Sequence, residues 1–144
     1  MGFTEWCLNM AHGSINHVGI ATPSLDESET IWAALGFTAA GDQVVQEHGV
    51  RIRYMHGDED ARIELLEPLT ADSPVGRFLK SRGPGVQQIA VNVSDIEEKI
   101  DELRLLGIKM INNEPVTGSD GKRIAFVHPS SCGGVLIELV ERTL

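Results

Sequence analysis

The chain has 144 residues and a formal net charge of −9, with 42% hydrophobic and 23% charged residues, a composition that is ordinary for a globular protein. The acidic charge argues against nucleic acid as a partner, because neutralising phosphates requires a basic face. No apolar run approaches the roughly 20 residues that a membrane helix needs, so no membrane partner is expected.

Residues 1–14 contain Glu5 and no basic cluster, and they do not make a convincing signal peptide. We expect them to form a loose N-terminal extension of a cytoplasmic protein. Cys7 and Cys132 are too few for a disulfide framework and are expected to be reduced thiols.

The first half of the chain predicts one strand, one helix and three further strands. The opening strand is expected over residues 15–21. Ser24 and Glu27 form a capping box that starts the helix, and Gly36 ends it. The three later strands are expected over residues 43–46, 50–56 and 61–67, between turns that glycines mark.

The pattern restarts after a linking helix within residues 72–85, which begins at Ser73-Pro74. A strand is expected over residues 86–93. Ser94 and Glu97 form a second capping box, and Gly107 ends the second long helix. The last three strands are expected near residues 108–111, 122–127 and 134–140.

Landmarks in the two halves keep a nearly constant spacing. The capping serines lie 70 positions apart, the helix-ending glycines 71 and the final strands 74, so we place a short insertion within residues 116–122. Matched landmarks of this kind indicate an internal repeat. We therefore predict an α+β protein with one domain over residues 15–144, built from βαβββ modules over residues 15–68 and 86–144.

Four polar side chains stand at equivalent positions of this repeat. Glu138 interrupts the apolar final strand, and a carboxylate on an apolar face is costly unless it is paired or binds a metal. Its counterpart in the first half is Glu64. On the opening strands the counterparts are His17 and Gln88, 71 positions apart. One imidazole, two carboxylates and one amide form an oxygen-rich donor set that suits Mn²⁺, Co²⁺, Fe²⁺ or Mg²⁺.

Each of these residues also has a purely structural interpretation. Glu138 could face solvent on an edge strand, and His17 could be an ordinary hydrogen-bonded histidine. Glu64 could pair with Arg62 or Arg53 at the surface, and Gln88 could be a satisfied buried amide. The equivalent placement favours the metal interpretation for the histidine and the two carboxylates, and it leaves the role of the glutamine open.

Five stretches of the chain carry a resemblance to a known family. They are Asn16–Ala21, Ile63–Pro68, Asp72–Val75 with Phe78-Leu79, Gly121-Lys122 with Phe126–Pro129, and Cys132–Leu139. On these stretches the chain resembles the methylmalonyl-CoA epimerase family of the vicinal oxygen chelate superfamily. The resemblance runs from about Ile15 to Glu141.

The resemblance implies a cupped, barrel-like mixed sheet with the helices outside. It implies one divalent metal ion (Co, Mn, Zn, Fe or Mg) and proton transfer at the α-carbon of a 2-methylmalonyl-CoA-like thioester through a metal-stabilised enolate. His17, Glu64 and Glu138 fall on ligand positions of the family, and Glu138 doubles as the expected base. The resemblance further implies a small acyl-CoA-type substrate and a homodimer.

Two positions depart from the family pattern. The family usually has a His-His pair where this chain has Gln87-Gln88, so Gln88 is the fourth predicted ligand and a neutral amide replaces an imidazole. Some members carry a catalytic glutamate where this chain has Ile52. Glu47 is the nearest carboxylate and is the predicted second catalytic residue.

Two other functions remain open for this sequence. A glyoxalase-I-like lyase, or another metal enzyme of the superfamily with a different substrate, is compatible with the altered donor set. A metal-free protein that binds small molecules is compatible with the fold. Lys80, Arg82, Lys122 and Arg123 are the cations available to an anionic ligand such as a coenzyme A phosphate.

Overall fold

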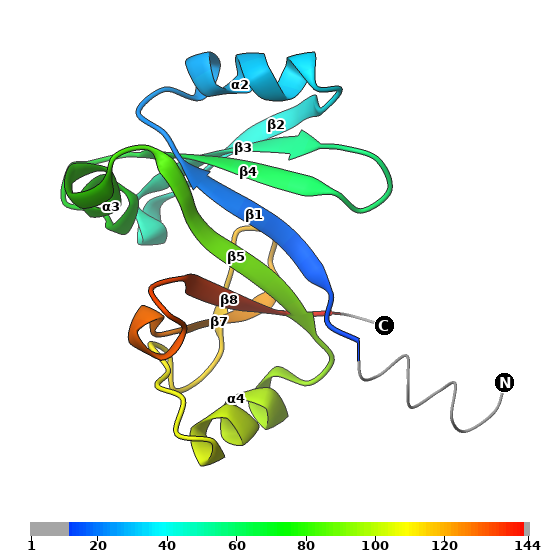
Figure 1. The fold of residues 1–144 in the computed structure, drawn as a ribbon, viewed down its shortest axis with the longest axis vertical. Coiled ribbons are helices and arrows are strands. Elements are labelled where there is room, and N and C mark those ends of the chain that lie inside the picture. Colours follow the sequence, from blue (N-terminus) through cyan, green and yellow to red (C-terminus); the bar gives the residue numbers. More distant parts are fainter. Residues whose placement is uncertain (1–11, 143–144) are drawn as a thin grey trace, which may run out of the picture.

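The computed structural model describes residues 12–142 and contains one eight-stranded sheet flanked by helices (Figure 1). The first half comprises β1 (Ile15–Ala21), α2 (Leu25–Ala34), β2 (Thr38–Val45), the 3₁₀ helix η1 (Gln46–His48), β3 (Val50–His56), β4 (Arg62–Pro68) and α3 (Pro74–Arg82). The second half comprises β5 (Gly85–Val93), α4 (Ile96–Leu105), β6 (Val116–Thr117), β7 (Arg123–Val127), the 3₁₀ helix η2 (Pro129–Ser131) and β8 (Leu136–Glu141).

The sheet is built from two equivalent halves that join at its centre. Its strand order is β2-β3-β4-β1-β5-β8-β7-β6. In each half the opening strand pairs in parallel with the closing strand, β1 with β4 and β5 with β8. The two opening strands pair antiparallel with each other. The predicted α+β architecture of two βαβββ modules is therefore confirmed.

The sheet curls so far that its two edges approach each other (Figure 1). Gln43 on edge strand β2 donates from Nε2 to the carbonyl oxygen of Ser119, in the turn after edge strand β6, at 2.6 Å. We call the concave face of the sheet the inner face and the convex face the outer face.

Two predicted details of the second half are wrong. No strand forms over residues 108–111, where the chain makes a single bridge between Met110 and Val127. The edge strand is instead the two-residue β6, inside the stretch where we placed the insertion. The second capping residue is Asp95 and not Ser94, since the Asp95 carboxylate accepts from the backbone N–H of Glu98. Aspartate caps a helix as well as serine does, so composition alone did not separate the two neighbours.

The helices α2 and α4 begin with the same arrangement of hydrogen bonds. Ser24 caps α2 as predicted, by accepting from the backbone N–H of Glu27. A carboxylate from the closing strand reaches the first turn of each helix: Glu67 accepts from the N–H of Leu25, and Glu141 accepts from the N–H of Ile96. An anionic side chain at a helix N-terminus is favourable because it binds unpaired N–H groups at the positive end of the helix dipole.

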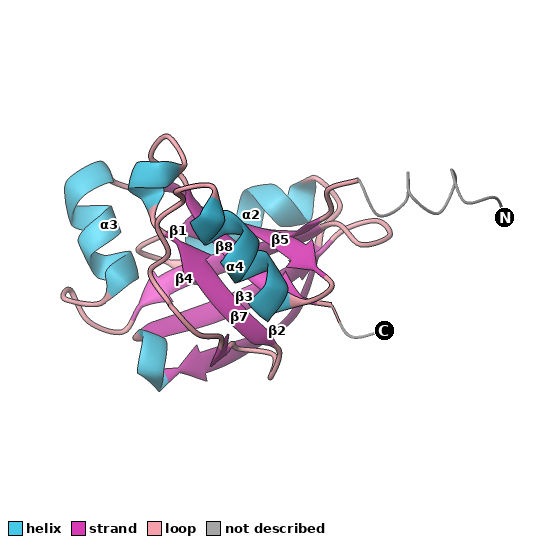
Figure 2. Cartoon of the chain, turned by 90° about the horizontal axis from the view of Figure 1, so that it is seen from below, coloured by secondary structure: helices cyan, strands magenta, loops and turns pink. Residues whose placement is uncertain are grey.

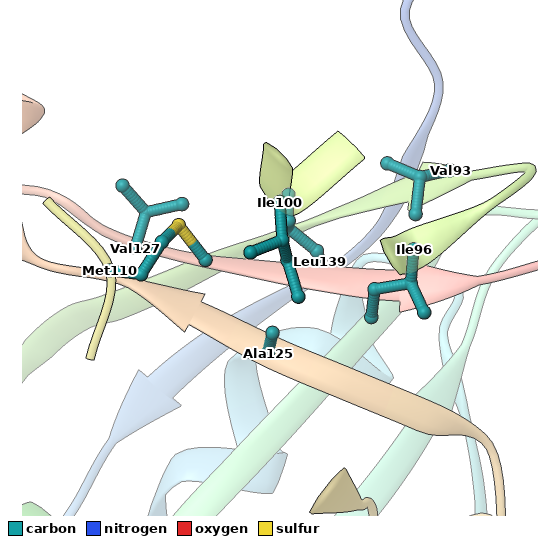
Figure 3. Packing of buried hydrophobic residues seen from close by; sticks show 7 residues of the cluster. All are labelled: Val93, Ile96, Ile100, Met110, Ala125, Val127 and Leu139. Atoms are coloured by element: carbon teal, nitrogen blue, oxygen red, sulfur yellow. The ribbon is translucent and has the colours of Figure 1, made fainter. Parts of the chain in front are cut away.

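The two long helices cover the outer face. Under α2, the side chains of Leu25, Met55, Ile63 and Leu65 form the buried cluster, with Trp32 and Phe37 packed against it. Under α4, the cluster is Val93, Ile96, Ile100, Met110, Ala125, Val127 and Leu139 (Figure 3). Seen from below, α4 lies across β7 and β8 (Figure 2). The burial of these apolar faces fixes which side chains of each strand turn inward.

Two predicted segments remain, one at the N-terminus and one between the two halves. Residues 1–11 of the predicted N-terminal extension, Cys7 included, fall outside the described residues. The predicted linking helix forms as α3, where Ser73 caps the helix and Pro74 occupies its first turn. None of the described helices has the length and apolar character that crossing a bilayer requires.

Candidate active site

The four predicted polar residues lie together on the inner face at the centre of the sheet. His17 extends from β1, Glu64 from β4, Gln88 from β5 and Glu138 from β8, four strands that are neighbours in the sheet order. Their exposed fractions are 5%, 8%, 9% and 7%, so all four are buried. The repeat thus brings together residues that are up to 121 positions apart in the chain (17 to 138).

The imidazole of His17 lies between the two carboxylates. Its Nδ1 is 3.1 Å from Glu64 Oε2 and 2.7 Å from Asn16 Oδ1, and its Nε2 is 3.2 Å from Glu138 Oε2. Gln88 closes the group from the fourth strand. Its Nε2 lies 3.1 Å from His17 Nε2 and donates to Glu138 Oε2 at 3.4 Å.

Burial and mutual charge change the protonation of this cluster. Burial raises the pKa of Glu64 to about 7, with His17 opposing and Glu138 adding to the rise. Burial disfavours the charged form of His17, but the hydrogen bond to Glu138 and the charges of Glu64 and Glu138 outweigh it, and the pKa of His17 is raised. With both carboxylates ionised, the one imidazole that is their only described ion-pair partner would leave excess negative charge, so the cluster either keeps a proton on Glu64 or accepts a cation.

The donor atoms of the cluster are of types that bind divalent cations. Carboxylate, amide and imidazole donors suit divalent ions, and an added positive charge would offset the cost of burying two carboxylates. Within residues 12–142, no group of three or more His, Cys, Asp and Glu side chains already has its donor atoms arranged to hold a metal ion. The fit therefore rests on the chemistry and burial of the donors.

A glycine makes room for the glutamine. Gly19 lies directly opposite Gln88 in the β1–β5 register. A Cβ atom at position 19 would lie 2.5 Å from Gln88 Cγ and 3.0 Å from Cδ, which is inside contact distance. The absence of a side chain at Gly19 therefore allows the Gln88 side chain to lie against β1 and reach His17.

One polar side chain on the inner face was not among the residues predicted from the sequence. Tyr54 on β3 pairs with Glu64 in the β3–β4 register, and its hydroxyl donates to Gln43 Oε1 at 2.8 Å. A polar residue that interrupts an apolar strand is conspicuous in a sequence, whereas a half-buried tyrosine is ordinary in a strand. The useful signal is its alternation with Arg53 and Met55, which both turn toward α2.

Two other candidates lie away from the cluster. Glu47 is exposed on η1, outside the buried cluster of four residues. Ile52, at the position of the family's additional glutamate, is buried among Val45, Val50 and Leu66. The inner wall of the first half therefore carries an apolar side chain at that point.

Comparisons with known proteins agree with this fold. Residues 16–126 match the family described as the glyoxalase/bleomycin resistance protein/dioxygenase superfamily. The chain is 38% identical over 132 residues to the mitochondrial methylmalonyl-CoA epimerase of Dictyostelium discoideum, covering 90% of this chain and 79% of that protein. It is 35% identical over 132 residues to the ethylmalonyl-CoA/methylmalonyl-CoA epimerase of Cereibacter sphaeroides, covering 90% and 98%.

A solved structure is similarly close. A variant of Streptomyces coelicolor methylmalonyl-CoA epimerase in complex with 2-nitronate-propionyl-CoA superposes with a TM-score of 0.83. The two chains are 37% identical, and the match covers 90% of this chain and 94% of that one.

Proposed function

The chain belongs to the glyoxalase/bleomycin resistance protein/dioxygenase superfamily and is an isomerase of the methylmalonyl-CoA epimerase type, and on this basis we propose that it inverts the α-carbon of a 2-methylmalonyl-CoA-like thioester. The observation that carries the proposal is the buried cluster in which two carboxylates flank one imidazole on the inner face. A buried carboxylate beside a bound thioester is the group that such a proton transfer needs.

His17, Glu64, Gln88 and Glu138 are the residues that we propose to hold one divalent ion. Such an ion, when bound, polarises a carbonyl oxygen and stabilises the negative charge that develops on it when the α-proton leaves. Gln88 sets this chain apart, because a neutral amide oxygen is a weaker donor than the imidazole that the family resemblance implies. We therefore expect weaker metal binding than in relatives that have histidine at this position.

Glu138 is the residue that we propose to remove the α-proton. In the part of the chain that the structure describes, its side-chain contacts with His17 and Gln88 both use Oε2. These contacts hold the carboxylate in place and leave Oε1 to take the proton. Glu47 stays a sequence-based prediction for the second proton-transfer group, and its exposure on η1 gives it no support.

The coenzyme A part of the substrate requires cations outside the buried cluster. Lys122 lies in the turn that meets β2, 3.9 Å from Asp120, and so stands at the rim of the inner face. Arg123 pairs with Glu97 and Glu141. We therefore propose that Lys122 contacts a coenzyme A phosphate.

The test is conversion of a single enantiomer of methylmalonyl-CoA, followed with a reporter enzyme that consumes only the other enantiomer. We expect conversion that chelator abolishes and added Mn²⁺ or Co²⁺ restores. Gln88→His serves as the matched variant and should bind the ion more tightly in a titration. Conversion of a glutathione hemithioacetal in place of the thioester would favour the glyoxalase-I-like function, and no bindable divalent ion would favour the metal-free binding protein.

Two further proposals concern the whole protein. The predicted homodimer can be tested by sedimentation of the full chain. The predicted cytoplasmic location stays a proposal, since the relatives include proteins named as mitochondrial and proteins from bacteria.

A further inference from the structure

Inversion at carbon requires proton transfer on both faces of the reacting atom. When Glu138 removes the α-proton from one face, the planar enolate must receive a proton on the other face for the configuration to change. This step rests on the proposed function. The question is which described group stands on the wall of the inner face that is opposite to β8.

That wall is formed by β2 and β3 of the first half. Arg53 and Met55 on β3 turn outward, where Arg53 pairs with Asp26 and Glu29 of α2. Tyr54, which lies between them, therefore turns inward. It packs against the buried cluster that contains Ile52.

The hydroxyl of Tyr54 is held where the two halves meet. It donates to Gln43 Oε1 at 2.8 Å, and Gln43 in turn donates to the carbonyl of Ser119 in the second half at 2.6 Å. A phenol keeps its proton at neutral pH, so this hydroxyl is available as a donor.

The repeat supplies a direct comparison for this hydroxyl. Tyr54 is the cross-strand partner of Glu64, and Phe126 is the cross-strand partner of Glu138. The two aromatic side chains thus occupy equivalent places beside the two carboxylates. Only the one on the wall opposite Glu138 carries a proton that it can transfer.

Other groups on that wall are poorer donors. Ile52 has no proton to transfer, and Gln43 is an amide that already bridges the two halves. His56 is exposed at the end of β3, and Asp120 is exposed in the turn. Of the inner-face side chains that the structure describes on β2 and β3, Tyr54 is the one with a transferable proton inside the cup.

We propose that Tyr54 is the second proton-transfer group of the reaction. Glu138 takes the α-proton as the C–H bond breaks and its electron pair enters the thioester as an enolate. The Tyr54 O–H bond then breaks, its proton forms the new C–H bond on the opposite face, and the phenol becomes a phenolate. Water returns a proton to Tyr54 and accepts the one held by Glu138, which restores both groups.

The test separates proton removal from inversion. Each enantiomer of methylmalonyl-CoA, in a separate sample, is incubated in D₂O with wild type or Tyr54→Phe, under the same divalent-ion supply. Loss of the α-proton is followed by NMR, and inversion by a reporter enzyme specific for the other enantiomer. We expect Tyr54→Phe to lose inversion by on the order of 10²- to 10⁴-fold. Exchange with retained configuration should stay within a few-fold of wild type for the enantiomer whose α-proton faces Glu138, and should be lost with inversion for the other enantiomer.

Two outcomes would overturn the role of Tyr54: equal losses of exchange and inversion for both enantiomers, or no loss of either. A wild type that neither exchanges nor inverts the substrate would overturn the proposed function, and the role of Tyr54 with it. Phe126→Tyr is the matched control, because it adds a hydroxyl at the equivalent place and should not restore inversion to Tyr54→Phe. Restoration by that variant would also contradict the proposal.

Discussion

The two halves of the molecule share the same arrangement of strands and helices and differ in the side chains on the inner face. Both begin with a strand, a capped helix and a carboxylate that reaches back to the helix start. On the inner face the first half presents a histidine and a tyrosine, and the second half presents a glutamine and a phenylalanine at the equivalent places. The repeat therefore places side chains at equivalent positions in the two halves. The differences in residue type at those positions give the side chains distinct chemical roles.

The outer faces differ in how well they are filled. Under α2, the rings of Trp32 and Phe37 pack edge to face with centroids 5.5 Å apart. The equivalent residues in the second half, 71 positions later, are Leu103 and Ile108. An open pocket of about 700 Å³ borders α4, and these two smaller side chains contribute to its lining. The side chains under the two helices are thus another feature in which the halves have diverged.

The largest predicted effect compares the two carboxylates. Glu138→Gln should lower the inversion rate by on the order of 10²- to 10⁴-fold, because it removes the proposed base and keeps the shape of the side chain. Glu64→Gln retains an oxygen donor and removes no proposed base, so it should lose at least about tenfold less. Steady-state kinetics with metal-loaded proteins measure both. Equal losses would mean that the carboxylates share one role.

A second prediction concerns the pH dependence of stability in the metal-free protein. Glu64 has a folded pKa of about 7 against an ordinary 4.5, so the folded state holds a proton that the unfolded state releases. Stability should therefore fall as pH rises from about 4.5 to about 7, by roughly 3 kcal/mol. The raised pKa of His17 acts with the same sign, since its stabilising contribution is lost as pH rises through the folded value.

Urea unfolding at pH 5 and pH 8 with chelator present measures this effect. Glu64→Gln is the matched control and should be less sensitive to pH over the same range. A wild type whose unfolding free energy changes no more than that of the variant would contradict the assignment to Glu64.

The third prediction uses the glycine opposite Gln88. Position 90, equivalent to position 19 in the second half, is alanine, which lies opposite His17. Gly19→Ala should cost about 1–3 kcal/mol, since its Cβ would overlap the Gln88 side chain. In Gln88→Ala the same substitution should cost much less, so a double-mutant cycle by urea unfolding should give a clear coupling energy. If the costs of the two substitutions simply add, the strain in Gly19→Ala does not come from contact with the Gln88 side chain.

The smallest predicted effect concerns the packing under the two helices. Trp32→Leu should destabilise the protein by about 1 kcal/mol, because it removes an aromatic pair from a half-buried position. Leu103→Trp in the second half should change stability by less than this, since the cavity beside α4 leaves room for the larger ring. Thermal unfolding of the two variants compares them directly. A larger cost for Leu103→Trp would show that the cavity cannot accept it.

Much of the secondary structure and the repeat could be predicted, because helix caps, turn glycines and strand patterns are local features of the sequence. Ser24 marks the start of the first helix as predicted, and the 71-residue offset linked His17 with Gln88 before their contact was known. The second helix cap was missed by one residue, since Ser94 and Asp95 are both good caps and only the backbone geometry selects one. The expected strand at 108–111 failed because an apolar stretch does not reveal whether it has a pairing partner.

The site residues that could be predicted are the polar ones that interrupt an apolar strand. A polar residue that is common in half-buried strands could not be singled out. His17 and Glu138 stand out because burying them is costly. Tyr54 does not stand out, because a tyrosine fits a half-buried strand without explanation. Its contact with Gln43 depends on the curl of the sheet, which brings β2 to the turn beyond β6 and leaves no trace in either local sequence.

The most direct test of the account is the fate of the α-proton of one methylmalonyl-CoA enantiomer in D₂O, followed by proton NMR. The account predicts enzyme-dependent loss of that signal, with deuterium in both enantiomers, and near-complete suppression of the loss in Glu138→Gln. If wild type at a concentration equal to that of the substrate, supplied with Mn²⁺ or Co²⁺, exchanges the proton no faster than buffer alone, the central claim is contradicted.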